Sequence, residues 1–482
     1  MSGAAIERLR AAMTGDVLAP GDDGYDDARR VWNADVDRRP AVIARCTTAS
    51  DVSAAVRCAV DHGLEIAVRG GAHSISGMSV VDDGLMVDLS LMAAVQVDAD
   101  ARRALVGGGA LLGDVLAAAQ EHALALPVGA ISHTGVGGLT LGGGMGWLTR
   151  KHGLTIDNLL SAQVVLADGR VVRASAEEHR DLFWALRGGG GNFGVVTQFE
   201  LALHPVGPLV EFGMVFWGLD QGSEALRAAR DVVGTLPAGV NVVVAGLNAP
   251  PEPFVPEQHH FQPGYAVLVV GFHGEDEHRA VLDRFRSAVP PLWEVATPVP
   301  YLALQQMLDE ANAWGQYYYD KGLYLDDLTD PVIAAFVEHV PRKASPGSVV
   351  LMYRLDGAYC EVDDDATAFS GGRSPRYNAF IIANAPDAGL LEADRDWVRG
   401  LHDALLPHSS DEGTYVNALS GNESEDRVRR AYGAQKYQRL ARIKAQYDPQ
   451  NVFHRNANVV PAAPAPGQRL PVDDSVAAAP HA

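Results

Sequence analysis

The chain has 482 residues, with 39 Lys+Arg against 60 Asp+Glu, a formal net charge of −21 and 47% hydrophobic residues. This composition is typical of an acidic globular protein with room for two or three domains. Because a strongly negative surface repels phosphate backbones and anionic lipids, we expect no nucleic-acid partner and no membrane partner. The longest apolar stretches, such as Ala266–Val270, are far shorter than the roughly 18 residues of a membrane span.

The N-terminus and the cysteines indicate the compartment. Glu7 and Arg8 place charge where a secretory signal has its apolar core, which favours a cytoplasmic location. Cys46, Cys58 and Cys360 have neither the spacing of zinc ligands nor that of a disulfide framework. We therefore expect buried thiols and no metal site.

Strand-like and helical patterns alternate between residues 39 and 205. The predicted elements are, in order, a helix capped by Ser50 and ended by Gly63, strands at Glu65–Arg69 and Leu85–Leu89, a hairpin over Asp168–Gly169 within Ala162–Ala174, a helix from a capping box at Ser175–Glu178 to Leu186, and a strand at Val196–Leu203. This alternation predicts an α+β region.

Prolines mark a change of pattern after residue 205, at Pro205, Pro208 and Pro250–Pro263. Further strands are predicted at Tyr265–Phe272, Val349–Leu355 and Asn378–Ile382. Two helical runs follow Ser424 and end before Pro449. The predicted division is a first domain of residues 1–206, a second domain of residues 207–409 with a sheet backed by helices, a C-terminal part of residues 410–461, and a disordered tail of residues 462–482.

The 50 glycines are clustered, chiefly in Arg69–Ser74, Gly135–Gly146 and Arg187–Gly194. Residues without a Cβ let backbone N–H groups approach an anion closely, so several such clusters can wrap a long diphosphate cofactor. A single cluster is more often just a tight turn. Three clusters in one domain favour a nucleotide site.

These clusters are parts of longer motifs. The first cluster, the stretches Ser132–Gly144 and Phe183–Thr197, and Tyr447–Phe453 near the end together resemble the FAD-linked oxidases of the berberine bridge enzyme type, in the vanillyl-alcohol oxidase superfamily. The resemblance covers nearly the whole chain and is closest to the bacterial branch of 6-hydroxy-D-nicotine oxidase and polyketide-tailoring oxidases. It implies that both chain ends form a PCMH-type FAD-binding domain and that the second domain covers the flavin with an antiparallel sheet.

The resemblance also implies how FAD is held. His73 takes the place of the histidine that is bonded covalently to the flavin methyl carbon. Ile131 stands where many members have a second, cysteine tether, so a single tether is expected. The further cofactor contacts implied by position are Arg69, Gly70, Gly71, Ala72, Ser74, Gly77, Met78, Ser132, His133, Thr134, Gly137, Gly138, Gly142, Gly143, Trp147, Val196, Asn456 and Asn458.

The catalytic base is less clear, because Ala418 replaces the tyrosine that often follows the Tyr-x-Asn motif of the family, here Tyr415–Asn417. Tyr319 and Lys321 are candidates, since they share one face of a strand and a lysine favours a neighbouring phenolate. Tyr353 is a further candidate. An aromatic core strand with a solvated lysine is the alternative, and an amine substrate needs no strong base.

The activity implied by the resemblance is that of an FAD-dependent oxidase. It takes a hydride from a C–H bond next to oxygen or nitrogen in a small or medium organic substrate, such as a secondary metabolite, an alkaloid or a sugar-like molecule, and reduces dioxygen to hydrogen peroxide. Thr134 is expected beside the path of dioxygen. The alternatives are a flavin-dependent oxygenase that tailors a polyketide-like substrate and a non-catalytic flavin-containing binding protein. The oligomeric state is not indicated.

Overall fold

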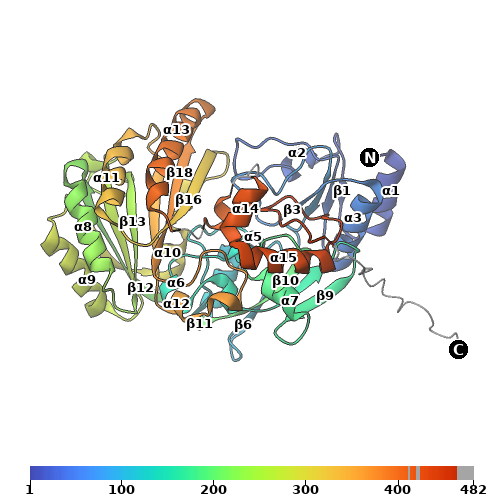
Figure 1. The fold of residues 1–482 in the computed structure, drawn as a ribbon, viewed down its shortest axis with the longest axis horizontal. Coiled ribbons are helices and arrows are strands. Elements are labelled where there is room, and N and C mark those ends of the chain that lie inside the picture. The colour runs from blue at the N-terminus through green and yellow to red at the C-terminus, as the bar shows by residue number, and fades with distance from the viewer. Residues whose placement is uncertain (411–412, 420–423, 464–482) are drawn as a thin grey trace.

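The computed structural model describes residues 1–410, 413–419 and 424–463. These residues form two adjoining regions (Figure 1). One region contains both the first helix and the last helix of the described chain, and the other is a large sheet with helices packed on it. The predicted α+β class is confirmed. Residues 464–482, most of the predicted disordered tail, lie outside the described residues.

The first region is built on two sheets. The four-stranded sheet has the order β1 (Val17–Leu18), β2 (Val42–Arg45), β4 (Leu85–Asp88) and β3 (Ile66–Arg69). The five-stranded sheet has the order β5 (Val95–Asp98), β6 (Arg103–Gly107), β10 (Val195–Ala202), β8 (Leu159–Val165) and β9 (Val171–Ser175). A small antiparallel pair joins β7 (Leu124–Ala125) to β11 (His204–Pro205). Strands β8 and β9 form the predicted hairpin around Asp168–Gly169.

The helices of this region are α1 (Gly3–Ala12), α2 (Tyr25–Ala28), α3 (Ala49–His62), α4 (Leu112–Gln120), α5 (Val136–Gly142), α6 (Thr149–His152), α7 (Arg180–Leu186), α14 (Glu425–Tyr432) and α15 (Ala434–Tyr447). Two predicted caps are wrong. The N-cap of α3 is Thr48 rather than Ser50, because Thr48 forms the capping box with Asp51. Helix α7 begins five residues after Ser175, because His179 adopts a left-handed φ of 47°.

The second region is a seven-stranded antiparallel sheet. Its order is β15 (Trp293–Pro300), β12 (Leu209–Gly218), β14 (Pro263–Gly271), β13 (Val240–Asn248), β17 (Val349–Leu355), β18 (Arg376–Ala385) and β16 (Tyr317–Leu325). Helices α8 (Gly222–Val233), α9 (Glu275–Ala288), α11 (Asp330–His339) and α13 (Ala388–Leu405) cover one face, while α10 (Tyr301–Gln306) and α12 (Ala358–Glu361) lie nearer the first region (Figure 1). Strands β14, β17 and β18 correspond to the three strands predicted there.

Side chains alternate between the two faces of this sheet, as the two-residue period of a strand requires. On β17, Val350 and Met352 pack against the helices, whereas Leu351 and Tyr353 belong to the core shared with the first region. The same alternation holds on β13. One face is therefore the core of the helix-covered layer, and the other faces the glycine-rich segments.

Buried polar groups tie the C-terminal segment to the third glycine cluster. The Lys444 ammonium donates to the backbone oxygen of Asn192 (2.8 Å) and pairs with Asp448 (3.0 Å), and neither charged side chain is exposed. The Asn192 side chain also donates to the oxygen of Ala457 (3.1 Å) and accepts from the N–H of Val459 (2.9 Å). These bonds hold residues 457–459 beside the third glycine cluster.

Candidate active site

A cavity of about 1020 Å³ is lined by residues of both regions. We call the backbone of the three glycine clusters the glycine wall. We call the inner face of the seven-stranded sheet, with the adjoining segments 249–254 and 306–312, the sheet wall. One cavity therefore borders both walls.

The glycine wall depends on close contacts between backbones. A Cβ on Gly71 would lie 2.3 Å from the nitrogen of Gly135, so neither segment tolerates a side chain there. The N–H of Gly190 donates to the oxygen of Leu141 (3.0 Å), which joins the third cluster to the second. Gly138 lines the cavity with no protein atom within 4 Å of its Cβ position. The wall is thus a cradle that added side chains would fill.

Polar atoms at one end of this wall lack protein partners. Among the described residues, Asn456 Oδ1 and the Tyr432 hydroxyl are buried without a hydrogen-bond partner, and both residues line the cavity. Arg455 lines it too, held by Glu65 (3.0 Å), with its Nε also unpartnered. Buried polar groups are nearly always hydrogen-bonded, so these atoms indicate a polar ligand.

His73 stands on the cavity edge, in the loop after β3. Its Nε2 lies 2.9 Å from His133 Nδ1, and its ring stacks on Trp32 with centroids 4.1 Å apart. Burial, and to a smaller extent the neighbouring His133, lowers the pKa of His73 to about 3. The imidazole is therefore neutral and keeps a nitrogen lone pair at physiological pH.

Trp32 also connects this loop to the sheet wall. Its other face stacks on Tyr318 of β16, with centroids 3.6 Å apart. The Asn33 side chain accepts from the N–H of Tyr318 (2.9 Å) and donates to its oxygen (3.0 Å). These contacts fix the position of β16 relative to the His73 loop. Asp320 lies two residues after Tyr318, on the same face of the strand.

Asp320 is the acidic group of β16 that lines the cavity, and only 7% of its surface is exposed. Its strand partner is Ile382, which pairs in turn with Val349, and both also line the cavity. In the described part of the chain no ion pair involves Asp320, and burial raises its pKa to about 7 despite the opposing charge of Lys321. A carboxyl group that titrates near neutrality suits proton transfer.

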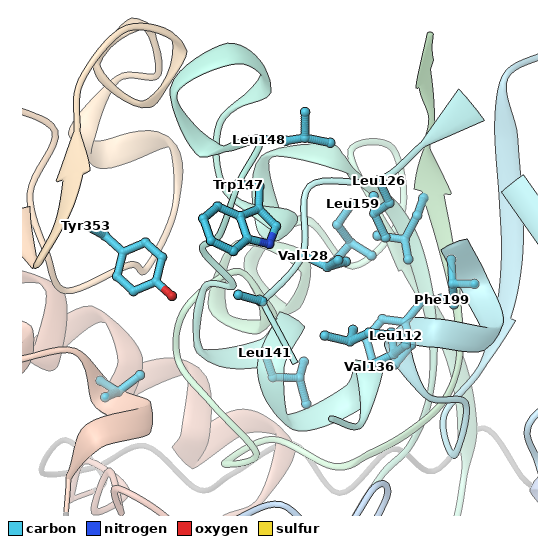
Figure 2. Packing of buried hydrophobic residues seen from close by; sticks show 14 of the residues in the cluster. Leu112, Leu126, Val128, Val136, Leu141, Trp147, Leu148, Leu159, Phe199 and Tyr353 are labelled. Atoms are coloured by element: carbon cyan, nitrogen blue, oxygen red, sulfur yellow. The ribbon is translucent and has the colours of Figure 1, made fainter. Parts of the chain in front are cut away.

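Two buried tyrosines face the same cavity. Figure 2 shows Tyr353 of β17 with its hydroxyl directed toward the segment that carries Trp147 and Leu141. The Tyr415 hydroxyl accepts from the N–H of Gly144 (3.0 Å) and from the Asn417 side chain (2.9 Å). Burial raises the pKa of each tyrosine to about 12. Both are hydrogen-bond donors rather than bases at neutral pH.

The structure does not place Tyr319 and Lys321 at the cavity, and this corrects the sequence prediction. They do share one face of β16, but it is the face turned toward α13. There the Tyr319 ring lies beneath the guanidinium groups of Arg395 (5.3 Å) and Arg399 (5.4 Å). Alternation then turns Asp320 to the cavity.

The remaining predicted site residues divide into two groups. Those that line the cavity are Gly70, Gly71, Ala72, His73, Ser74, Met78, Thr134, Gly137, Gly138, Trp147, Val196, Tyr353 and Asn456. Those that stand outside the lining are Arg69, Gly77, Ser132, His133, Gly142, Gly143 and Asn458. Several of the second group support the wall: Arg69 binds Asp88 (3.2 Å), and the Ser132 N–H donates to Asp309 (2.8 Å).

Sequence reasoning missed Asp320, Trp32, Tyr432 and Arg455. For Asp320 a signal existed, because a lone acid inside the aromatic run of residues 317–324 is unusual in a buried strand. The sequence did not show which face of β16 carries Asp320. Trp32 carries no sequence signal, since its role arises only from stacking between residues far apart in the chain.

The prediction about buried thiols has a mixed outcome. Cys46 is buried, but Cys58 and Cys360 are only partly buried, which corrects the expectation for those two. No group of three metal-ligating side chains occurs within residues 1–410, 413–419 and 424–463. In those same ranges no helix has the length and apolar character needed to cross a membrane.

Comparison with known proteins agrees with this geometry. The family described as "FAD binding domain" matches residues 40–175, and the family described as "Berberine and berberine like" matches residues 414–460. (R)-6-hydroxynicotine oxidase of Paenarthrobacter nicotinovorans is 30% identical over 466 residues, which cover 93% of this chain and 97% of that protein. The chain belongs to the berberine bridge enzyme-like FAD-linked oxidoreductases. It is thus an enzyme of an oxidase family that acts on CH–OH and CH–NH donors, and its cofactor is FAD.

Solved structures extend the match. The crystal structure of 6-hydroxy-D-nicotine oxidase from Arthrobacter nicotinovorans has a TM-score of 0.82 at 28% identity, covering 93% of this chain and 98% of the other. Glucooligosaccharide oxidase from Acremonium strictum, with its 6-S-cysteinyl, 8α-N1-histidyl FAD, has a TM-score of 0.82 at 27% identity and covers 95% and 100%.

The residues present fit FAD. The glycine wall leaves space where a Cβ would project, as at Gly138, and the unpartnered atoms of Asn456 and Tyr432 face a polar ligand. His73 presents a neutral imidazole at the same wall. We therefore assign the glycine wall to FAD.

Proposed function

We propose that the chain is an FAD-dependent oxidase that removes a hydride from a C–H bond next to nitrogen or oxygen of a small or medium organic molecule, with dioxygen reduced to hydrogen peroxide. Relatives that oxidise 6-hydroxynicotine and glucooligosaccharides support this activity. The observation that carries it is Asp320, a carboxyl group with a pKa of about 7 in the sheet wall, opposite the FAD cradle.

The chain's own residues handle the proton of the donor. Bound FAD supplies the hydride acceptor and returns the electrons to dioxygen. Asp320 accepts the proton of the N–H or O–H group next to the reacting carbon, and its pKa near neutrality suits that role. Tyr353 and Tyr415 stay protonated and orient the polar end of the substrate. The apolar side chains of the sheet wall keep water away from the reacting carbon.

We further propose a single covalent tether through His73. Because its Nε2 is engaged with His133, we assign the bond with the flavin methyl carbon to Nδ1. The linkage replaces one C–H and one N–H bond by a C–N bond, and two electrons and two protons convert dioxygen to hydrogen peroxide. Ile131 lines the cavity without a nucleophile, and none of the three cysteines is among the lining residues, so no second bond forms.

Oxygen uptake tests the oxidase reaction. A panel of amines, alcohols, oligosaccharides and polyketide-like phenols is supplied to the holoenzyme, and peroxide is measured against product with and without catalase. One peroxide per product is expected. If much less peroxide than product forms, and the product contains an oxygen atom from labelled dioxygen, the enzyme is instead an oxygenase.

A further inference from the structure

The charges around the cavity are unevenly distributed. Of the described residues that line it, Asp320, Glu252 and Glu310 carry carboxylates beside the sheet wall. The one lining guanidinium belongs to Arg455, at the glycine wall, where it is already paired with Glu65. No lysine is among these lining residues. The substrate end of the cavity is therefore negative.

Asp320 is the buried member of this group. It is 93% buried and has no ion-pair partner among the described residues, because the side chain of Lys321 lies on the opposite face of β16. Ile382, its strand partner, offers only apolar contact. Burying an ionised carboxylate without a counter-charge is unfavourable, so a cationic group that reaches Asp320 gains more than it would at an exposed acid.

The rest of the sheet wall suits a neutral sugar or an anion less well than a cation. Its inner face is largely apolar at Phe212, Leu268, Leu351 and Phe380, and Ser348, Tyr353 and Asn384 add uncharged polar groups. A sugar would therefore leave the buried Asp320 carboxylate without a counter-charge. An anion would meet the carboxylates and no cation at this end. An organic cation with an apolar body suits both the carboxylate of Asp320 and the apolar side chains around it.

We propose that the sheet wall binds an amine substrate as its ammonium ion, through an ion pair with Asp320, and thereby selects amines over alcohols and sugars. This proposal rests on the proposed oxidase function, because it names the substrate class of the same site. Its subject is recognition, so it is tested by binding, without turnover.

The probes are benzyltrimethylammonium and neopentylbenzene, which share one shape and differ in having a charged nitrogen or a carbon. Each is titrated into the holoenzyme and followed through the flavin absorbance. Asp320→Asn is expected to weaken binding of the cation by at least about 30-fold, because the charge partner is lost in a buried site, and to change binding of neopentylbenzene less than about 2-fold. Asp326→Asn is the matched control, since Asp326 is an exposed acid outside the cavity. It removes the same charge and should leave both affinities within about 2-fold.

Equal binding of the two probes to the wild-type enzyme would overturn the proposal. So would an Asp320→Asn variant that binds the cation as tightly as the wild type. Failure of the oxidase function is separately visible: the flavin of the same samples is photoreduced and exposed to air. Slow reoxidation would contradict the oxidase reaction and leave the binding result intact.

Discussion

The two walls of the cavity recognise their ligands by different means. The glycine wall is made by backbone, and residues such as Gly71 and Gly135 matter because they have no side chain. The sheet wall is made by side chains, and its chemistry depends on which face of β16 or β17 a residue occupies, as for Asp320 and Tyr353. Recognition by backbone is therefore readable from the sequence as a motif. Recognition at the sheet wall depends on the position of single side chains.

The largest effect is expected at His73, the residue beside the glycine wall that we propose bonds the flavin covalently. His73→Ala should abolish covalent flavin completely, because no other nucleophile is predicted at the flavin methyl. Acid-denatured protein on a gel should lose its yellow fluorescence. The native variant should still bind FAD, since the backbone cradle remains.

His133→Ala sharpens this test. If His133 holds His73 by its Nε2 and takes up its proton, the variant should acquire the tether more slowly but at the same peptide. Peptide mapping by mass should find one flavin-bearing peptide, which contains His73. A second flavin-bearing peptide, or one containing a cysteine, would refute the single tether.

Asp320→Asn should stabilise the protein at high pH. In the unfolded chain this carboxyl has a pKa near 3.8, against about 7 when folded. The contribution of this group to the wild-type free energy of unfolding is therefore complete below about pH 3.8 and is lost as the pH rises through about 7. The asparagine side chain does not ionise, so the variant keeps its stability over this range. Its free energy of unfolding should exceed the wild-type value by about 4 kcal/mol near pH 8 and by less near pH 5. Urea unfolding of both holoenzymes at the two pH values measures it. A difference independent of pH would show that Asp320 does not titrate between them.

Much of the fold and of the cofactor site was predictable. The glycine clusters imply the cradle directly, because the absence of Cβ is itself the sequence signal, and β17 was predicted with its exact bounds. The substrate site was predictable only in part. Tyr353 was predicted and lines the cavity, but Tyr319 and Lys321 were proposed and Asp320 was missed, since a strand pattern gives the two faces without showing which one the helices cover. That choice is made by α13, more than 60 residues away in sequence.

Turnover should separate the two candidate proton acceptors of the sheet wall. Asp320→Asn should lower kcat/KM by about 100-fold or more, as expected for loss of a general base. Tyr353→Phe should lower it by about 10-fold at most, because burial keeps that hydroxyl protonated and its loss removes a single hydrogen bond. Steady-state oxygen uptake with the best amine of the panel gives both values. The reverse order would assign the base to Tyr353.

Two glycine variants should separate folding from cofactor binding. Gly71→Ala places a Cβ against the backbone of Gly135 and should cost about 1 to 3 kcal/mol of stability. Gly138→Ala meets no protein atom within 4 Å and should leave the stability of the FAD-free protein unchanged or slightly higher, while weakening FAD binding. Urea unfolding and FAD titration, both in the His73→Ala background, measure the two effects. Equal losses of stability would show that Gly138 is required by the fold instead.

The smallest effect concerns dioxygen at the glycine wall. Thr134 lines the cavity next to His133 and carries a small side chain. A bulkier, apolar side chain at this position should narrow the approach of dioxygen to a flavin held by the glycine wall. Thr134→Leu should therefore slow reoxidation of the photoreduced flavin by about tenfold, roughly 1.4 kcal/mol of barrier, and slow its anaerobic reduction by substrate much less. Thr134→Ser, which keeps the small size and the hydroxyl, is the control and should behave as the wild type. Stopped-flow absorbance measures both half-reactions. Equal slowing of the two would mean that Thr134 sets the position of the flavin rather than the access of dioxygen.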